Sequence, residues 1–367
     1  MREDWEYKTF GEIGTFLRGK NIQKADFVSG GLPCIHYGQI HTKFDISIDY
    51  HLSEIPQEVY DKAIIASPGD VIIAITSEDI DGSCKSVVWL GNYDIAVSAH
   101  AAILKHNMNG KFIAYYLRSN TFFTQKLKYA RGFKVMEIKT KDLAKLVLPI
   151  PPKPTQLSIV SELDKINKLI QIKKEQLKDY DALAQSIFYE MFGDPVVNEK
   201  GWEVKKFGDL FKLKSGDGLS SKDFNTGIYP VYGGNGISGY HNSFNMKGCY
   251  IIIGRVGVYC GNVRKVDGEF WLTDNAFRLI YKENEQNSFF ILYLLNILDL
   301  HQYANAAAQP VISNLTLKSI NVPLPPLSLQ QSFAHKIEQI DRQKAEVQKT
   351  ITDLETLLAA RMQYWFD

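Results

Sequence analysis

The chain has 367 residues, and its 42 lysines and arginines nearly balance its 41 aspartates and glutamates, so the formal net charge is only +1. This length suggests two or three domains, and an apolar fraction of 45% excludes wholesale disorder. A strongly basic nucleic-acid-binding protein would carry more charge. A DNA-binding function must therefore rest on where the charges lie and not on their sum.

The cysteines and the hydropathy pattern exclude further classes. None of Cys34, Cys84, Cys249 and Cys260 belongs to a CxxC pair, and no histidine lies at zinc-finger spacing beside them. We therefore expect no metal, no cofactor and no disulfide framework. The first residues, MREDWEYK, lack the apolar stretch of a signal peptide, and the longest apolar run, residues 289–298, is about half of a bilayer span. We expect a soluble cytoplasmic protein without a membrane partner.

The chain contains an internal repeat. The segment WEYKTFGEI, starting at Trp5, returns as WEVKKFGDL, starting at Trp202. Further on, GDVIIAIT aligns with GCYIIIGR, which pairs Thr76 with Arg255, and AHAAIL aligns with DNAFRL. Finally, LPIPP at residues 148–152 aligns with VPLPP at residues 322–326. Two halves of the chain thus share one structural plan.

Each half predicts a globular part followed by one long helix. Short β-branched runs bounded by glycine, such as residues 71–76 and 250–253, predict buried strands, and helical patterns lie near residues 112–129 and 288–303. The predicted fold class is α+β, with two pseudo-two-fold-related mixed α/β domains separated by two long antiparallel coiled-coil helices. The expected boundaries are residues 1–154 for the first domain, 155–194 for the central spacer helix, 195–327 for the second domain and 328–367 for the C-terminal spacer helix.

Apolar residues recur along both helices at alternating spacings of four and three, which is typical of a coiled coil of about five heptads. Ser328 and Gln331 form a capping-box start for the second helix. An amphipathic helix lying on its own domain is the alternative, but a stripe this narrow favours pairing of the two helices. A helix of about 36 residues is about 54 Å long, so we expect a dumbbell with one domain at each end. Such symmetry would mirror two half-sites on a DNA duplex.

Motifs that suggest catalysis lack the context that they require. GGNGISG at residues 233–239 fits GxGxxG, but no helix start follows it, so we expect a mobile loop and not a dinucleotide site. The ExK pairs at Glu137 and Glu203 lack a convincing paired acid, and no Asn/Asp-Pro-Pro-aromatic loop of an aminomethyltransferase is present. No Ser/His/Asp or Cys/His set emerges either. The chain is predicted to be non-catalytic by itself.

The charges are unevenly placed along the sequence. Residues 126–145 carry a local net charge of +5, each predicted domain carries +2, and residues 155–195 carry −2. This distribution favours DNA at the domains and a protein partner along the helices, with a solvated basic face as the alternative.

The candidate DNA contacts are polar residues in glycine-bounded loops. Arg and Asn can read guanine and adenine edges, while Lys mostly holds phosphate. The predicted contacts are Arg18, Lys20, Lys85, Arg131, Lys134, Ser215, Lys222, Tyr232, Asn235, Arg255, Arg264 and Gln309.

The ordered series YPVYGGNGISGY, YIIIGRVG, WLTDNAFRL and VPLPPLSLQQ, leading into a long helix, resembles type I restriction–modification specificity (S) subunits. The first half, through PCIHYGQI, GDVIIAIT and LPIPPKPTQ, resembles a second, more divergent copy. PKPTQ, at the start of the first long helix, replaces the more usual Pro-Leu-x-x-Gln. The two copies also differ in their loops, since His36–Gln39 stands where the second copy has GGNG, and Thr76–Ser77 stands where it has Arg255. We therefore expect the two domains to read different half-sites.

The resemblance implies two target-recognition domains that together read a bipartite double-stranded DNA sequence. It also implies docking of two methyltransferase subunits on the helices and of restriction motor–nuclease subunits around that core, with catalysis in those partners. A DNA-reading scaffold of another methyltransferase-based defence system is the alternative to this function. A self-sufficient DNA-modifying enzyme and a duplicated scaffold for another ligand are the other hypotheses.

Overall fold

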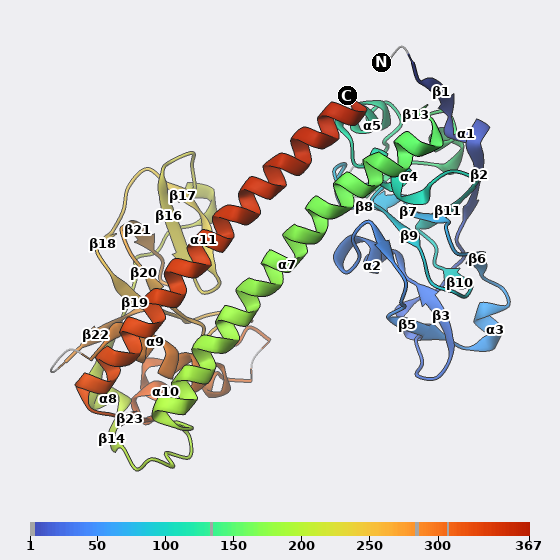
Figure 1. Cartoon of the computed structure of the whole chain (residues 1–367). Coiled ribbons are helices and arrows are strands. Elements are labelled where there is room, and N and C mark those ends of the chain that lie inside the picture. Colours follow the sequence, from blue (N-terminus) through green and yellow to red (C-terminus); the bar gives the residue numbers. More distant parts are fainter. Residues whose placement is uncertain (1–3, 133–134, 283–285, 307) are drawn as a thin grey trace. The chain divides into compact units, whose positions relative to one another are not determined.

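The computed structural model describes residues 4–132, 135–282, 286–306 and 308–367. The chain forms two compact units, the first made of residues 1–173 and 350–367, the second of residues 174–349. Two 40-residue helices, α7 (Lys153–Phe192) and α11 (Leu327–Phe366), contribute one part to each unit (Figure 1). An α+β fold with mixed sheets and two long helices is thereby confirmed.

The first unit holds two main sheets and two small ribbons. The five-stranded sheet has the order β2 (Gly14–Arg18), β11 (Ala101–His106), β7 (Val71–Ala74), β9 (Ser86–Trp89) and β4 (Ser47–Ile48), and the four-stranded sheet has the order β5 (Ser53–Ile55), β3 (Leu32–Ile35), β10 (Ile95–Val97) and β6 (Ile64–Ala66). The ribbons pair β1 (Glu6–Thr9) with β13 (Val147–Ile150) and β8 (Thr76–Ser77) with β12 (Met136–Glu137). The short helices are α1 (Phe10–Ile13), η1 (Lys24–Asp26), α2 (Tyr37–Thr42), α3 (Gln57–Tyr60), α4 (Gly110–Tyr116), α5 (Asn120–Lys126) and α6 (Thr140–Leu143).

The second unit repeats this plan. One sheet has the order β15 (Phe211–Ser215), β22 (Ala276–Tyr281), β19 (Tyr250–Gly254) and β20 (Val263–Val266), and the other has the order β17 (Gly236–His241), β16 (Tyr229–Gly233), β21 (Glu269–Leu272) and β18 (Met246–Lys247). A ribbon pairs β14 (Glu203–Lys206) with β23 (Asn321–Leu324). The short helices are α8 (Phe207–Leu210), η2 (Ser221–Asp223), α9 (Ser288–Ile297), η3 (Leu300–Tyr303) and α10 (Asn314–Lys318).

The strand registers correct the sequence alignment of the two copies by one residue. Ala74 pairs with Ala101 in the first unit, and Gly254 pairs with Ala276 in the second. The residue that matches Arg255 is therefore Ile75 and not Thr76. Both copies of the GDVIIAIT block are mostly apolar, so their hydropathy fits either alignment, whereas the hydrogen bonds between the strands fix which residues correspond.

One glycine of the repeat is required in both units by a close backbone approach. A Cβ atom on Gly19 would lie 2.1 Å from the carbonyl oxygen of Ser98, and one on Gly216 would lie 2.1 Å from that of Leu272. Both amides donate to the strand opposite, to Ala101 and Ala276. The residues before these glycines are therefore held at the same place in each unit.

The two long helices run antiparallel. In the first unit Glu162 of α7 binds Arg361 of α11, and in the second unit Asp181 of α7 binds Lys344 of α11 at 2.6 Å. Partners thus follow opposite orders along the two helices, which confirms the antiparallel pair predicted from the sequence.

Both shorter helical patterns end earlier than the sequence predicts. The first divides into α4 and α5, because the Ser119 hydroxyl accepts a hydrogen bond from the Phe122 amide and so caps a new helix. The second ends at Ile297, shortly before Asp299, whose φ of 44° cannot continue an α-helix.

Candidate nucleic-acid interface

In the first unit, Arg18 and Arg131 both contact Glu137, Arg18 through its side chain and Arg131 through its backbone. Arg18 ends β2, and its guanidinium lies 3.1 Å from the Glu137 carboxylate on β12. Arg131 exchanges two backbone hydrogen bonds with Glu137, at 3.1 and 2.8 Å. The structure therefore brings two predicted DNA contacts to the β8–β12 ribbon. It adds Glu137, which the sequence presented only as part of an isolated ExK pair.

A cluster of aromatic and histidine rings adjoins this ribbon. The Tyr37 ring lies 5.1 Å from the His100 ring and 6.2 Å from the His41 ring, measured between centroids. His41 Nε2 donates to the Thr76 carbonyl at 3.0 Å, and Thr76 pairs with Glu137. Polar rings of this kind can form hydrogen bonds with phosphates or with base edges in the grooves of DNA. These three residues are not among the contacts predicted from the sequence, although the HYGQI block was their visible signal.

The lysines of the first unit differ in how they are used. Lys85 donates to the His41 carbonyl at 2.8 Å, and its pKa is lowered by burial and then by the neighbouring charge of Arg118. Lys20 is exposed, and its backbone is bound to Val97 and Ala99. Lys134 lies outside the described residues. Lys85 thus stabilises the local fold, whereas Lys20 leaves its ammonium at the surface.

In the second unit, three loops converge at the ends of β16 and β19. Arg255 follows β19, its amide donates to the Asn275 carbonyl at 2.9 Å, and its guanidinium lies 5.5 Å from the centre of the Phe277 ring. The Arg264 guanidinium donates to the Asn235 carbonyl at 3.1 Å. The structure therefore gathers these predicted residues at one end of the unit.

Other predicted residues extend this region. Gly257 donates to the Pro310 carbonyl at 2.9 Å, which places exposed Gln309 beside the Arg255 loop. Tyr232 accepts a hydrogen bond from the Thr273 amide at 2.9 Å, in the loop that also holds Asn275.

Ser215 and Lys222 complete the predicted set in this unit. Ser215 ends β15 opposite Phe277 of β22, and β22 also pairs with β19, the strand that Arg255 follows. Lys222 is exposed on η2, and the segment after η2 is bound to β17 through Asn225 and Tyr240. Lys222 therefore lies near β17, at the margin of the region that holds the other predicted contacts of this unit.

The glycine-rich segment of the second unit is a hairpin turn and not the mobile loop that the sequence suggests. Gly233 ends β16 and Gly236 starts β17, and Gly236 has a φ of 109°. The two residues between them form the short connection that antiparallel strands favour. The segment therefore holds Asn235 in a defined position.

The loop after Arg255 also exposes apolar side chains that no sequence signal singled out. Val258 is 75% exposed and Tyr259 is 52% exposed. Exposed apolar groups beside base-reading residues can contact thymine methyl groups.

The described residues show no metal-binding cluster, and they use the two ExK glutamates in ion pairs. Among them, no cluster of three His, Cys, Asp or Glu side chains could hold a metal ion. Of the two ExK glutamates, Glu137 binds Arg18 and Glu203 lies 3.8 Å from Lys205, so both take part in ion pairs. In the part of the chain that the structure describes, no helix is long and apolar enough to cross a bilayer.

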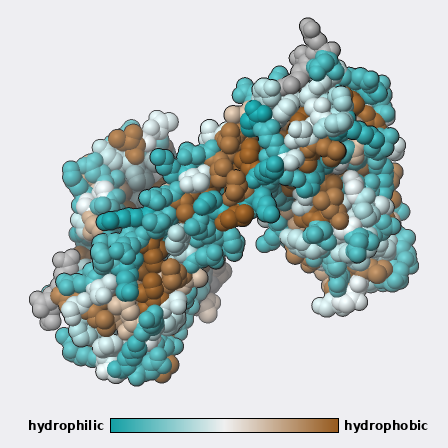
Figure 2. All heavy atoms as spheres, in the orientation of Figure 1, coloured by the Kyte–Doolittle hydropathy of each residue, from teal (hydrophilic) through white to brown (hydrophobic). Residues whose placement is uncertain are grey.

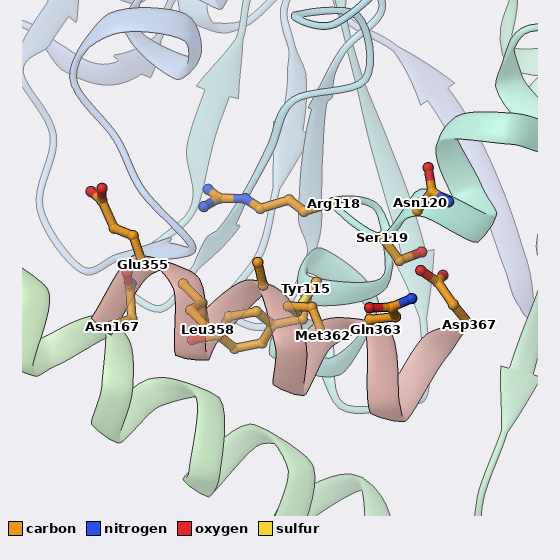
Figure 3. Close-up of a pocket in the computed structure, with 11 residues that line it drawn as sticks. Tyr115, Arg118, Ser119, Asn120, Asn167, Glu355, Leu358, Met362, Gln363 and Asp367 are labelled. Atoms are coloured by element: carbon orange, nitrogen blue, oxygen red, sulfur yellow. The ribbon is translucent and has the colours of Figure 1, made fainter. Parts of the chain in front are cut away.

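Each unit also has a groove where a short helix, α4 in the first unit and α9 in the second, meets both long helices. In the first unit, Tyr115, Asn167 and Glu355 line a groove of about 530 Å³ with Leu358 and Met362 in its floor (Figure 3). This groove lies on the side of α4 that faces the end of α11.

In the second unit, Tyr293, Asp341 and Asp181 line a groove of about 680 Å³. The internal repeat matches these three residues with Tyr115, Asn167 and Glu355. Burial raises the pKa of Tyr293 to about 12 and also raises the pKa of Asp341. The two units therefore present one groove each at corresponding positions.

The model of the type I restriction modification DNA specificity domain matches this chain twice, over residues 2–179 and 199–356. The chain belongs to the type I restriction–modification DNA specificity family. It is therefore a DNA specificity subunit with two target-recognition segments. Members of this family are non-catalytic components of type I restriction–modification complexes.

Curated relatives support the assignment along the chain. The MjaVIII specificity subunit of Methanocaldococcus jannaschii is 21% identical, with 97% of this chain and 92% of that protein aligned. The EcoprrI specificity subunit of Escherichia coli is 26% identical over 245 residues, which are 63% of this chain and 61% of that protein.

A solved structure shares the fold. The S subunit of a type I restriction–modification system from M. genitalium aligns with a TM-score of 0.57 at 16% identity, covering 99% of this chain and 96% of that one.

Proposed function

We propose that each unit of this specificity subunit reads one half of a bipartite double-stranded DNA target. The target-recognition domains are residues 1–154 and 195–327, and the helices 155–194 and 328–367 are the spacer. The predicted contacts other than Lys85, whose ammonium is bound within the fold, supply the base and phosphate interactions.

The observation that carries this proposal is the exchange of side chains at matched backbone positions. Arg18 of the first unit corresponds to Ser215 of the second, because both precede the glycine that contacts the neighbouring strand. Ile75 corresponds to Arg255. Surfaces of one architecture but different hydrogen-bonding groups are suited to reading two different sequences.

We assign the long helices and the paired grooves to the protein partners. A repeat-related groove on each unit provides two equivalent places, which agrees with two methyltransferase subunits per chain. Apolar side chains on α7, such as Leu169, Ile172 and Leu183, are 47–50% exposed. Apolar patches also interrupt the hydrophilic surface of the molecule in the space-filling view (Figure 2). Restriction motor–nuclease subunits join through the same complex, which works on cytoplasmic DNA.

Replacing the second domain tests this function. A chimera whose residues 196–327 come from another specificity subunit should, with the methyltransferase, change one half of the methylated motif and keep the other. Sequencing of methylated genomic DNA measures both halves. A chimera that changes both halves, or a parent complex that methylates no bipartite sequence, would contradict the proposal.

A further inference from the structure

The ion pair of Arg18 with Glu137 lies among the predicted DNA contacts, yet one of its members is an acid. The side chains of Arg18 and Glu137 are 53% and 33% exposed, and their charged atoms lie 3.1 Å apart. An ion pair as exposed as this one contributes little to stability. Its place at the interface therefore needs another reason than stabilisation of the fold.

The second unit has no such pair at the corresponding positions. The β8–β12 ribbon of the first unit matches a bridge between Val256 and Val311, so Glu137 corresponds to Val311. Arg18 corresponds to Ser215. The fold thus accepts Ser and Val at the same two places, which shows that the plan common to both units does not depend on the ion pair.

The carboxylate also limits what Arg18 can bind. Glu137 would repel a DNA phosphate, so Arg18 is poorly suited to holding the DNA backbone. A base pair in the major groove is different, because the acceptors O6 and N7 of guanine lie beside the amino donor N4 of cytosine. Arg18 has five N–H donors, and Glu137 accepts only part of them.

We propose that Arg18 and Glu137 together read one G·C base pair in the half-site of the first unit. This inference rests on the proposed function. The guanidinium donates to guanine, and the carboxylate accepts from the amino group of cytosine. An A·T pair with thymine in place of cytosine would set the O4 acceptor of thymine against the carboxylate of Glu137. An A·T pair with thymine in place of guanine would offer the guanidinium of Arg18 one acceptor instead of two. The ion pair keeps the two groups oriented for one base pair before DNA binds.

The test uses substitutions that the second unit already contains, namely Arg18→Ser and Glu137→Val. The full chain is co-produced with its methyltransferase subunit, and methylated genomic DNA is sequenced. Both variants should relax the same G·C position of one half-site, with discrimination falling about 5- to 150-fold, and leave the other half-site unchanged. Relaxation at two different positions, at an A·T position or at none would overturn the inference.

Two further variants separate base reading from a structural role. The exchange Arg18→Glu with Glu137→Arg retains an ion pair, so a purely structural pair predicts the original motif, whereas base reading predicts its loss. Glu6→Ala removes another exposed ion pair of the same unit, in which the Glu6 carboxylate lies 2.9 Å from the Lys8 ammonium. This variant should leave the motif intact. If the parent complex methylates no bipartite sequence, the proposed function fails and this inference with it. If the parent methylates but the exchanged variant keeps the motif, only this inference fails.

Discussion

Arg255 occupies the position at which the first unit buries Ile75, and this single difference places a guanidinium at the end of β19. Its packing beside Phe277 orients the guanidinium, and its backbone is fixed by hydrogen bonds to Asn275 and Ile312. A donor held in this way is better suited to reading a base than to a loose phosphate contact.

Substituting Arg255 by alanine is expected to relax one base position of the half-site read by the second unit. The expected loss of discrimination is about 1–3 kcal/mol, because a bidentate contact to guanine contributes this amount. Methylated-motif sequencing measures it, and Lys212→Ala, at an exposed position of β15, provides a matched loss of charge. Equal weakening at all sequences would instead assign Arg255 to phosphate binding.

The sequence could name polar loop residues but could not decide how each one is used. Lys85 satisfies the predicted pattern, yet its ammonium is bound to His41, which lies 44 residues away in the chain. Glu137 belongs to an ExK pair in the sequence, and only the pairing of β12 with β8 brings it near Arg18. Contacts between residues distant in sequence carry this information, and a local pattern does not contain it.

At the scale of elements, the long helices were the most predictable part of the fold. Their apolar spacing predicts starts at residues 155 and 328, within two residues of the observed starts at Lys153 and Leu327. Strand registers were less predictable, because apolar runs such as residues 71–76 give the same pattern after a shift of one residue.

The contact between α7 and α11 in the first unit should depend on pH. The hydrogen bonds from Arg361 and Trp365 lower the pKa of Glu162, against the effect of partial burial. The stabilisation is therefore complete above the unfolded-state pKa of about 4.5 and is lost as pH falls through the lower folded-state value. Glu162→Gln should reduce stability by roughly 1 kcal/mol at neutral pH and much less in acid.

Chemical denaturation of the variant and the parent, measured from neutral to acidic pH, checks this expectation. Glu175→Gln is the control, since Glu175 pairs with Lys178 of its own helix at an exposed site. A difference between Glu162→Gln and the parent that stays constant with pH would contradict the assigned role of the carboxylate.

The spacer helices should set the gap between the half-sites. Inserting four residues after Lys173 and four after Lys349 lengthens both helices by about 6 Å and about one turn while keeping them in register. We expect the methylated half-sites to move apart by close to two base-pair steps, with their sequences unchanged. An unchanged gap would mean that the helices do not set the distance between the half-sites. An insertion in one helix alone should disturb the pairing of the two helices.

At the scale of the whole molecule, the repeat suggests that the chain is a ring opened at one point. In the second unit, the Trp202 indole donates to the carbonyl of Phe192, the residue that ends α7, at 2.8 Å. The matching residues of the first unit are Trp5 and Phe366, which share one core and line one cavity near the chain ends. The ends of the described chain thus meet where the second unit has a continuous connection.

A circular permutant is therefore expected to fold and to retain its specificity. A bridge of about four residues would join Asp367 to Met1 and restore the spacing seen between Phe192 and Trp202, since short loops close at little entropic cost. New termini would open at Val197, which is 70% exposed. With the methyltransferase in the same host, the permutant should direct methylation to the parent motif. A permutant that folds and binds the methyltransferase, yet methylates nothing or another sequence, would show that the two units need the original chain ends, and the ring interpretation would be wrong.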